Sequence, residues 1–172
     1  MEMNQLGTPE IGANEIEKIS VLGDGSFGTV FKGRCREEDV AVKVLHKQDL
    51  DDKTLQTFRQ EVEIVSKIFH PNVVLFMGAC TVPGHMMIVT ELMPKGDLET
   101  MLQDQKIQLS LLTRIKMAKD AALGITWLHN SNPQLIHRDL KTSNLLVDQN
   151  NRVKVCDFGL SQLKRHGELL LD

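Results

Sequence analysis

The sequence predicts an α+β fold on three observations. Short apolar runs rich in β-branched residues recur through the first half, where they predict five strands and one helix. Apolar residues at helical spacing then run from Ser110 to His129. Toward the end, two short apolar runs, 145–147 and 153–156, flank a polar turn, and this composition favours a β-hairpin.

Glycine, proline and charged residues delimit the elements of the first half. The first two strands are expected on either side of Gly23-Asp24-Gly25-Ser26-Phe27-Gly28, and the third over 40–45. A helix over 52–67 has its apolar residues at spacings of three and four. The last two strands are expected over 73–77 and 86–90, before a linker with Pro94 and Gly96.

Composition bounds the class of protein. A chain of 172 residues with 41% hydrophobic and 25% charged residues fits one domain or two small lobes. A net charge of −3, with six Phe, one Trp and no Tyr, argues against a nucleic-acid surface. Residues 1–13 are polar, contain Gly and Pro and have no apolar core, so they are expected to be neither a signal peptide nor a membrane anchor. Three widely spaced cysteines fit reduced thiols, so an intracellular, cytoplasmic protein is expected, and nothing indicates an oligomeric state.

The ends of the predicted hairpin carry metal-binding side chains. Asn144 enters the first strand and Asp157 leaves the second, so the hairpin would make them neighbours, with Asp139 and Lys141 on the loop before them. Mg²⁺ favours a few carboxylate or amide oxygens together with phosphate oxygens. The hairpin ends therefore predict a site for Mg²⁺ and phosphate.

The glycine-rich run Gly23-x-Gly25-x-x-Gly28 lies between two strands, whereas a dinucleotide-binding loop would open a helix. Glycines have no Cβ, so the backbone amides of such a hairpin can approach phosphates closely. A glycine-rich hairpin without a function satisfies the same pattern.

Lys43 lies between valines in the third predicted strand, where a lysine is costly unless its charge is paired. The following helix offers Glu61 and Glu63. At about 100° per residue, Glu61 lies closer to the centre of the apolar face, so it is the expected partner of Lys43. A solvated helix residue is the usual alternative for either glutamate.

Five motifs in order resemble the signature set of the eukaryotic protein kinases. They are the glycine run, Val40-Ala41-Val42-Lys43, Glu61, His137-Arg138-Asp139-Leu140-Lys141-x-x-Asn144 and Asp157-Phe158-Gly159. The resemblance covers Ile16 to the C-terminus. It implies a flexible lead-in over 1–14, an N-lobe over 15–90 with a five-stranded antiparallel sheet and one main helix, and over 91–172 the first part of a mainly helical C-lobe.

The amino-acid sequences of some segments are similar to those of narrower groups of protein kinases. Phe58-Arg59-Gln60-Glu61-Val62 and Asp139-Leu140-Lys141-Thr142-Ser143-Asn144 are similar to the tyrosine-kinase-like kinases. Residues 66–72 and 118–124 resemble the SH2-containing Shk dual-specificity kinases of social amoebae.

The resemblance implies roles for the candidate residues. Asp139 would orient the substrate hydroxyl and accept its proton, and Lys141 would neutralise charge on the transferred phosphoryl group. Lys43 would hold the α- and β-phosphates of ATP and pair with Glu61, while Asn144 and Asp157 would hold Mg²⁺. The residues implied to bind ATP are Leu22, Gly23, Gly25, Gly28, Val30, Ala41, Lys43, Thr90, Glu91, Met93, Asp97 and Leu146.

The expected function is ATP-dependent phosphoryl transfer to serine or threonine of a protein substrate in intracellular signalling. Lys141, two residues after Asp139, matches kinases that act on Ser/Thr, and tyrosine as a further acceptor stays open.

No Ala-Pro-Glu motif follows Gly159. The chain is therefore expected to be a fragment that ends within the activation segment. The alternative function is a truncated ATP-binding or interaction module without turnover. A P-loop NTPase is excluded, because Gly-x-x-x-x-Gly-Lys-Ser/Thr is absent.

Overall fold

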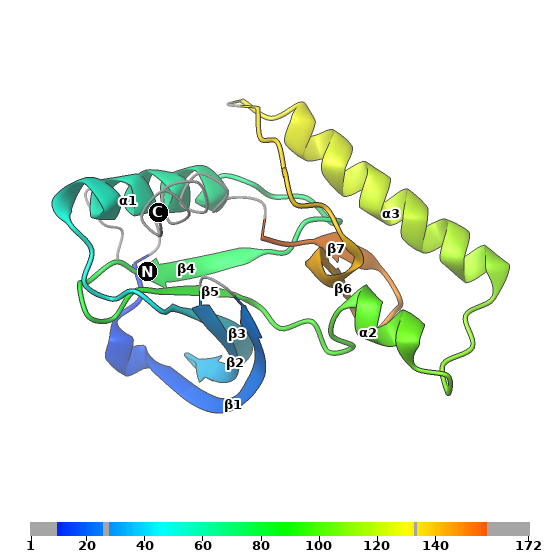
Figure 1. The fold of residues 1–172 in the computed structure, drawn as a ribbon, viewed down its shortest axis with the longest axis horizontal. Helices are drawn as coiled ribbons and strands as arrows, with labels where there is room; N and C mark the ends of the chain where they lie inside the picture. The colour runs from blue at the N-terminus through cyan, green and yellow to red at the C-terminus, as the bar shows by residue number, and fades with distance from the viewer. Residues whose placement is uncertain (1–9, 26–27, 133, 158–172) are drawn as a thin grey trace, which may run out of the picture. The chain divides into compact units, whose positions relative to one another are not determined.

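The computed structural model describes residues 10–25, 28–132 and 134–157, apart from the side chain of Glu61. Within them the chain forms two compact units (Figure 1). The first unit comprises 10–67 and 75–92, and the second comprises 68–74 and 93–157. Phe158, Gly159 and the rest of the expected activation segment lie outside the described residues.

The first unit is a five-stranded antiparallel sheet with one long helix, as the sequence predicted (Figure 1). Its strand order is β1-β2-β3-β5-β4, and every neighbouring pair is antiparallel. The elements are η1 (Ala13–Glu15), β1 (Ile16–Gly25), β2 (Gly28–Cys35), β3 (Glu38–Leu45), α1 (Asp52–Ser66), β4 (Phe76–Cys80) and β5 (Met87–Glu91).

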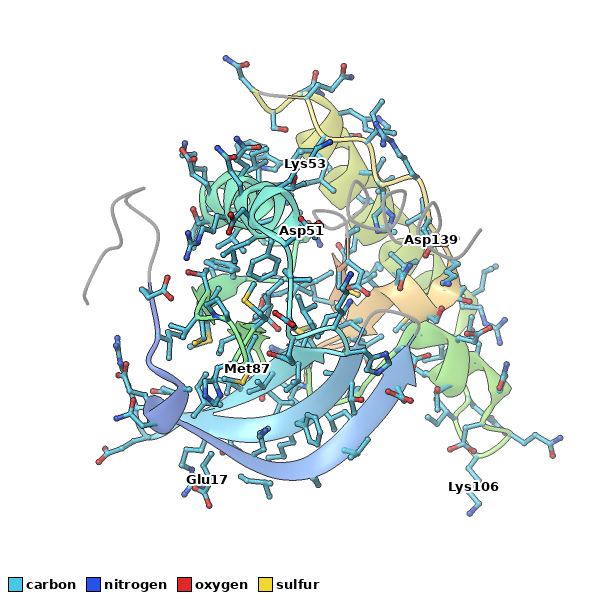
Figure 2. All side chains as sticks on the ribbon, turned by 60° about the vertical axis from the view of Figure 1, so that its left-hand side comes forward. Glu17, Asp51, Lys53, Met87, Lys106 and Asp139 are labelled. Carbon is cyan, nitrogen blue, oxygen red and sulfur yellow. The ribbon has the colours of Figure 1, made fainter. Side chains whose placement is uncertain are left out.

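Alternation along β3 divides the sheet into two faces. Val40 and Val42 are fully buried in a cluster that also contains Val89 and Met87, which is labelled in Figure 2. Successive strand residues point to opposite faces, so Lys43 belongs to the other face of the sheet. The cluster is the core of the first unit.

The helix α1 begins where its sequence provides a cap. Asp51, labelled in Figure 2, accepts a 2.7 Å hydrogen bond from the backbone N–H of Thr54, which satisfies one of the unpaired donors of the first turn. Phe58 and Val62 of the predicted apolar face are buried, at 0% and 2% exposure. Apolar packing therefore stabilises α1.

Residues Glu10–Glu15, called the strap here, pack against the sheet. The backbone N–H of Ile11 donates to the carbonyl oxygen of Ala79 in β4 at 2.9 Å, and the Ile11 side chain is 3% exposed. Glu15 accepts a 2.8 Å bond from the N–H of Gly12 and a 2.6 Å bond from Arg36. The packing of residues 10–14 differs from the flexible lead-in expected over 1–14, because Ile11 fills the edge of the core.

The second unit contains the predicted C-terminal hairpin and two α-helices (Figure 1). Asp148 makes the hairpin turn, since its Oδ1 accepts from the backbone N–H groups of Asn150 and Arg152 at 2.7 and 2.8 Å. The elements are α2 (Leu98–Gln103), α3 (Leu111–His129), η2 (Thr142–Asn144), β6 (Leu145–Val147) and β7 (Val153–Val155).

The segment Ile68–Val74 joins this hairpin rather than the sheet. The N–H of Val74 donates to the carbonyl oxygen of Val155 at 2.9 Å, and the N–H of Val155 donates to the carbonyl oxygen of Asn72 at 2.9 Å. The buried Asn72 side chain adds a 3.0 Å bond to the carbonyl oxygen of Val153. The strand expected over 73–77 is therefore wrong at its start, because β4 begins at Phe76.

α3 begins after the N-cap Ser110, close to its predicted start, and buries one side. Met117, Gly124 and Leu128 are buried, while Leu112 and Ile115 of the predicted apolar stripe are 62% and 57% exposed. None of the helices in the described ranges is long and apolar enough to span a membrane.

Candidate active site

The hairpin of the second unit closes with Asn144 and Asp157 at the same end. The N–H of Cys156 donates to the carbonyl oxygen of Asn144 at 3.0 Å, so the residues flanking β6 and β7 are held side by side. Asn144 is buried at 7% exposure. Asp157 has a φ of 58°, a conformation that costs energy for a residue with a Cβ and often marks functional sites.

The loop before the hairpin brings Asp139 and Lys141 to Asn144. The side-chain amide of Asn144 donates to the carbonyl oxygen of Asp139 at 2.7 Å and to its Oδ2 at 3.2 Å. Lys141 Nζ lies 3.3 Å from the same Oδ2. The Asp139 carboxylate, labelled in Figure 2, is thus held by an amide and an ammonium group, as a group that must orient a reactant would be.

His137 links this loop to the hairpin through hydrogen bonds. It is 3% exposed, and its Nε2 lies 2.8 Å from the carbonyl oxygen of Cys156, which can only accept a hydrogen bond. Nε2 therefore carries the proton, and Nδ1 accepts from the N–H of Asp139 at 3.3 Å. Arg138, between the two residues, has a φ of 62°. His137 thus ties Asp139 to the hairpin.

The oxygen donors of the site fit Mg²⁺. Since both bonds from the Asn144 amide nitrogen go to Asp139, the amide oxygen lies on the side turned away from Asp139. The described residues contain no cluster of three or more His, Cys, Asp or Glu side chains that could hold a metal ion. Asn144 and Asp157 together suit an ion that takes its other ligands from phosphate and water, as Mg²⁺ does.

Three residues expected to bind ATP, Met93, Asp97 and Leu146, belong to the second unit. Asp97 and Leu146 face each other in an isolated antiparallel bridge, and the N–H of Gly96 donates to the carbonyl oxygen of the buried Met93 at 3.1 Å. Asp97 also caps α2, because its two carboxylate oxygens accept from the N–H and hydroxyl of Thr100, each at 2.8 Å. The sequence analysis missed this cap, although an aspartate three residues before threonine at a helix start is its usual signal.

The first unit places further predicted residues on one face of its sheet. Val30 pairs with Lys43, and Ala41 pairs with Thr90. Directly paired residues share a face, and so do residues two apart along β3. These four side chains therefore lie on the face opposite the buried valine cluster. Lys43 is half-buried there rather than enclosed between the valines.

Two further predicted residues of the first unit are glutamates. Glu61 lies within α1, but its side chain is outside the described part, so the pairing with Lys43 stays a prediction. Glu91 uses its N–H and its carboxylate on Leu75, at 3.0 and 2.7 Å. Its carbonyl oxygen accepts a hydrogen bond from the Thr90 hydroxyl at 3.4 Å.

The three glycines of the loop, with Leu22 beside them on β1, differ in their surroundings. A Cβ on Gly28 would overlap with the carbonyl oxygen of Val44. A Cβ on Gly23 would meet no atom within 4 Å, and one on Gly25 would lie 3.7 Å from the carbonyl oxygen of Gly28. Among these three glycines, packing against the described residues thus requires glycine at 28 alone.

A polar cluster at the base of this loop was missed by sequence reasoning. The hydroxyl of Thr29 donates to Asp24 Oδ1 at 2.6 Å, and His46 Nε2 lies 3.1 Å from the same oxygen. These bonds, from Thr29 first and His46 second, lower the pKa of the Asp24 carboxyl. The hairpin register, which pairs Asp24 with Thr29, was the available signal.

Comparisons with known proteins show which proteins the chain is similar to. A model of a family described as protein tyrosine and serine/threonine kinase matches residues 16–169. Dual specificity protein kinase shkC of Dictyostelium discoideum is 63% identical over 166 residues, which are 96% of this chain and 33% of that protein.

Two further relatives match most of this chain. Dual specificity protein kinase shkA of Dictyostelium discoideum is 68% identical over 97% of this chain and 32% of that protein. Probable serine/threonine-protein kinase SIS8 of Arabidopsis thaliana is 50% identical over 86% of this chain and 15% of that protein. The chain spans a third or less of the length of these curated relatives.

Proposed function

The chain belongs to the protein tyrosine and serine/threonine kinase family, and on this basis we propose that it transfers a phosphoryl group from ATP to hydroxyl groups of a protein substrate. One observation carries the proposal. Asn144 and Lys141 both contact the Asp139 carboxylate at the end of the hairpin. A carboxylate fixed beside a cation suits the orientation of a hydroxyl nucleophile and the stabilisation of the transferred group.

In the proposed reaction, Asp139 orients the substrate hydroxyl and takes its proton, while Lys141 offsets negative charge on the transferred phosphoryl group. His137 and Asn144 contribute by holding Asp139, through the contacts described above. Phosphoryl transfer depends mainly on position and electrostatics, so this loop is the centre of the proposed chemistry.

Mg²⁺ is proposed as the cofactor, held by Asn144 and Asp157. When bound, such an ion neutralises the charge of the ATP phosphates. The carbonyl oxygen of Asn144 anchors β7 through Cys156, which fixes the spacing of the two ligands.

ATP is the proposed phosphoryl donor. Gly23, Gly25, Gly28 and Lys43 would serve the phosphates, and Glu61 would orient Lys43. The residues proposed to contact the nucleoside are Leu22, Val30, Ala41, Thr90, Glu91, Met93, Asp97 and Leu146. The open space above Gly23 supports this assignment, because nothing in the described fold explains the lack of a side chain there.

Serine and threonine are the proposed acceptors, with tyrosine as a further one. Lys141 supports the first, and the names of the two Dictyostelium relatives, both dual specificity kinases, support the second. A cytoplasmic role in signalling is proposed, in keeping with three cysteines that form no disulfide in the described part of the chain.

Transfer of labelled phosphate from Mg²⁺-ATP to a generic protein substrate tests the proposal. Asp139→Asn should abolish transfer, whereas Asp104→Asn, which changes an exposed aspartate after α2, should leave it intact. Nucleotide binding without Asp139-dependent transfer would favour the alternative, an ATP-binding module. The kinase names of the relatives do not favour that alternative.

A further inference from the structure

Thr81, which follows β4, is held by the strap. Its backbone N–H donates to Glu10 Oε1 at 2.8 Å, and its hydroxyl lies 3.2 and 3.3 Å from the two carboxylate oxygens of Glu10. Thr81 is 5% exposed, so these bonds are shielded from water. Bonds to a charged acceptor are stronger than neutral ones, and burial strengthens them further. Glu10 therefore fixes the end of β4.

The same residue is contacted by α1. Arg59 Nη2 donates to the carbonyl oxygen of Thr81 at 3.4 Å. Its neighbour in the helix, Phe58, is fully buried. Thr81 thus bonds to the strap through its N–H and hydroxyl groups, and to α1 through its carbonyl oxygen.

The strap is anchored at both of its ends. Ile11 pairs with Ala79 and is 3% exposed, and Glu15 pairs with Arg36 after β2. The dark-blue start of the described chain accordingly runs beside β4 (Figure 1). A displacement of Glu10 would therefore act on a defined strand end, which α1 also contacts.

We propose that Glu10 is a positioning residue, which holds α1 in place through Thr81 and Arg59. The proposal rests on the proposed function, because α1 carries Glu61, the expected partner of Lys43. With the strap attached, α1 is held in one position on the sheet. With the strap detached, Thr81 and Arg59 lose their common anchor, and α1 opens more often.

Hydrogen exchange of the 172-residue chain tests the coupling. Glu10→Ala should raise exchange of the α1 amides at least about tenfold, since it removes the bonds from both the N–H and the hydroxyl of Thr81 to a charged group. Glu17→Ala is the matched control: the same chemical change on β1, where Glu17 is exposed and points away from the sheet (Figure 2). Glu10→Gln keeps an oxygen acceptor for Thr81 and should restore most of the protection.

Two outcomes would overturn the proposal. In the first, Glu10→Ala raises exchange in the strap but leaves α1 unchanged. In the second, exchange rises equally in α1, in β3 and in the β6–β7 hairpin, which is general destabilisation.

The route through Arg59 has its own test. Arg59→Met should raise α1 exchange while the strap stays protected, and Glu10→Ala should then add little. If Glu10→Ala does not fold, Arg59→Met decides alone, since unchanged α1 exchange in that variant contradicts the route.

Activity separates this proposal from the proposed function. If the unmodified chain binds no Mg²⁺-ATP and transfers no phosphate, the proposed function fails, while the exchange measurement still decides the coupling. If the chain is active, Glu10→Ala should lower kcat about tenfold and change KM for ATP by less, because α1 acts through the orientation of Lys43. An unchanged kcat, with α1 exchange raised, would refute a positioning role in catalysis.

Discussion

At the residue scale, the glycines of the loop separate packing from ligand approach. Gly28 lies against the backbone of β3, whereas Gly23 faces open space. Neither has a φ in the left-handed region, so backbone conformation does not require glycine at these positions. The two residues should therefore respond differently to the same change.

Gly28→Ala should destabilise the first unit by about 1–3 kcal/mol, since the new Cβ would overlap with Val44. Gly23→Ala should change stability by less than about 0.5 kcal/mol but weaken binding of Mg²⁺-ATP. Urea unfolding and nucleotide titration measure the two effects. Equal losses of stability in both variants would contradict this assignment.

The base of the loop predicts a pH effect. The pKa of Asp24 lies below its ordinary value of 3.8, because Thr29 and then His46 hydrogen-bond to the carboxylate. A lowered pKa in the folded state stabilises the fold above the ordinary pKa, and this contribution disappears as pH falls through the lowered value. The link across the loop should thus open only in acid.

Thr29→Val should raise the pKa of Asp24 toward its ordinary value, and His46→Gln should raise it less, since Thr29 is the larger cause. Carboxyl NMR titration measures both. Asp39, whose pKa is lowered mainly by Lys32, serves as the internal reference and should not move. A larger rise from His46→Gln would contradict the order.

Contacts between residues close in the sequence could be predicted, whereas contacts with distant partners could not. Asp139, Lys141 and Asn144 are neighbours along the chain, so their meeting was predictable. The contacts of Gln48 were not predictable. Its amide nitrogen donates to the carbonyl oxygens of Leu45 and Met86 at 2.6 and 3.2 Å, and its amide oxygen accepts from the N–H of Met86 at 2.6 Å. Nothing next to Gln48 in the sequence indicates Met86.

At the element scale, Ile68–Val74 is the clearest difference from expectation. Its apolar residues fit a strand in either unit, because a short apolar run does not identify its partner. Asn72 decides the outcome, since its backbone and side chain both pair with β7. The hairpin, α1 and α3 were predictable because each carries its own period, caps or turn residues.

A substitution at Gly124 of α3 tests how closely Ile68–Val74 packs against this helix. Alanine is favoured over glycine within a helix by about 1 kcal/mol. At 124, however, a Cβ would overlap with the carbonyl oxygen of Asn72 and lie 2.8 Å from Val155 Cγ2. Gly124→Ala should therefore destabilise the second unit by about 1–3 kcal/mol.

The reverse change provides the control. Ala122→Gly, at an exposed position of the same helix, should cost about 1 kcal/mol through propensity alone. Urea unfolding measures both variants. A stabilising Gly124→Ala would show that the segment can shift without loss.

At the scale of the whole molecule, α3 presents apolar residues to solvent. Leu111, Leu112 and Ile115 are 74%, 62% and 57% exposed among the described residues. Large exposed apolar patches favour association. The 172-residue chain should therefore associate with itself as its concentration rises.

Leu112→Gln with Ile115→Gln should reduce this association and change the free energy of unfolding by less than about 0.5 kcal/mol per site. Leu128→Ala on the buried side, at 0% exposure, should instead cost about 2–5 kcal/mol. Light scattering over a concentration series and urea unfolding check the two expectations. Unchanged scattering in the double variant would place the association elsewhere.

The path of Ile68–Val74 also governs the order in which the molecule can be completed during synthesis. Asn72 leaves the ribosome before β4 and β5, yet its partner Val153 follows 81 residues later. The first unit can close its sheet while these residues wait as a loop, and the second unit cannot assemble until its last strand emerges. For the same reason, no single cut of the chain yields two intact units. A piece starting at Met93 would lack Ile68–Val74, the segment that pairs with β7.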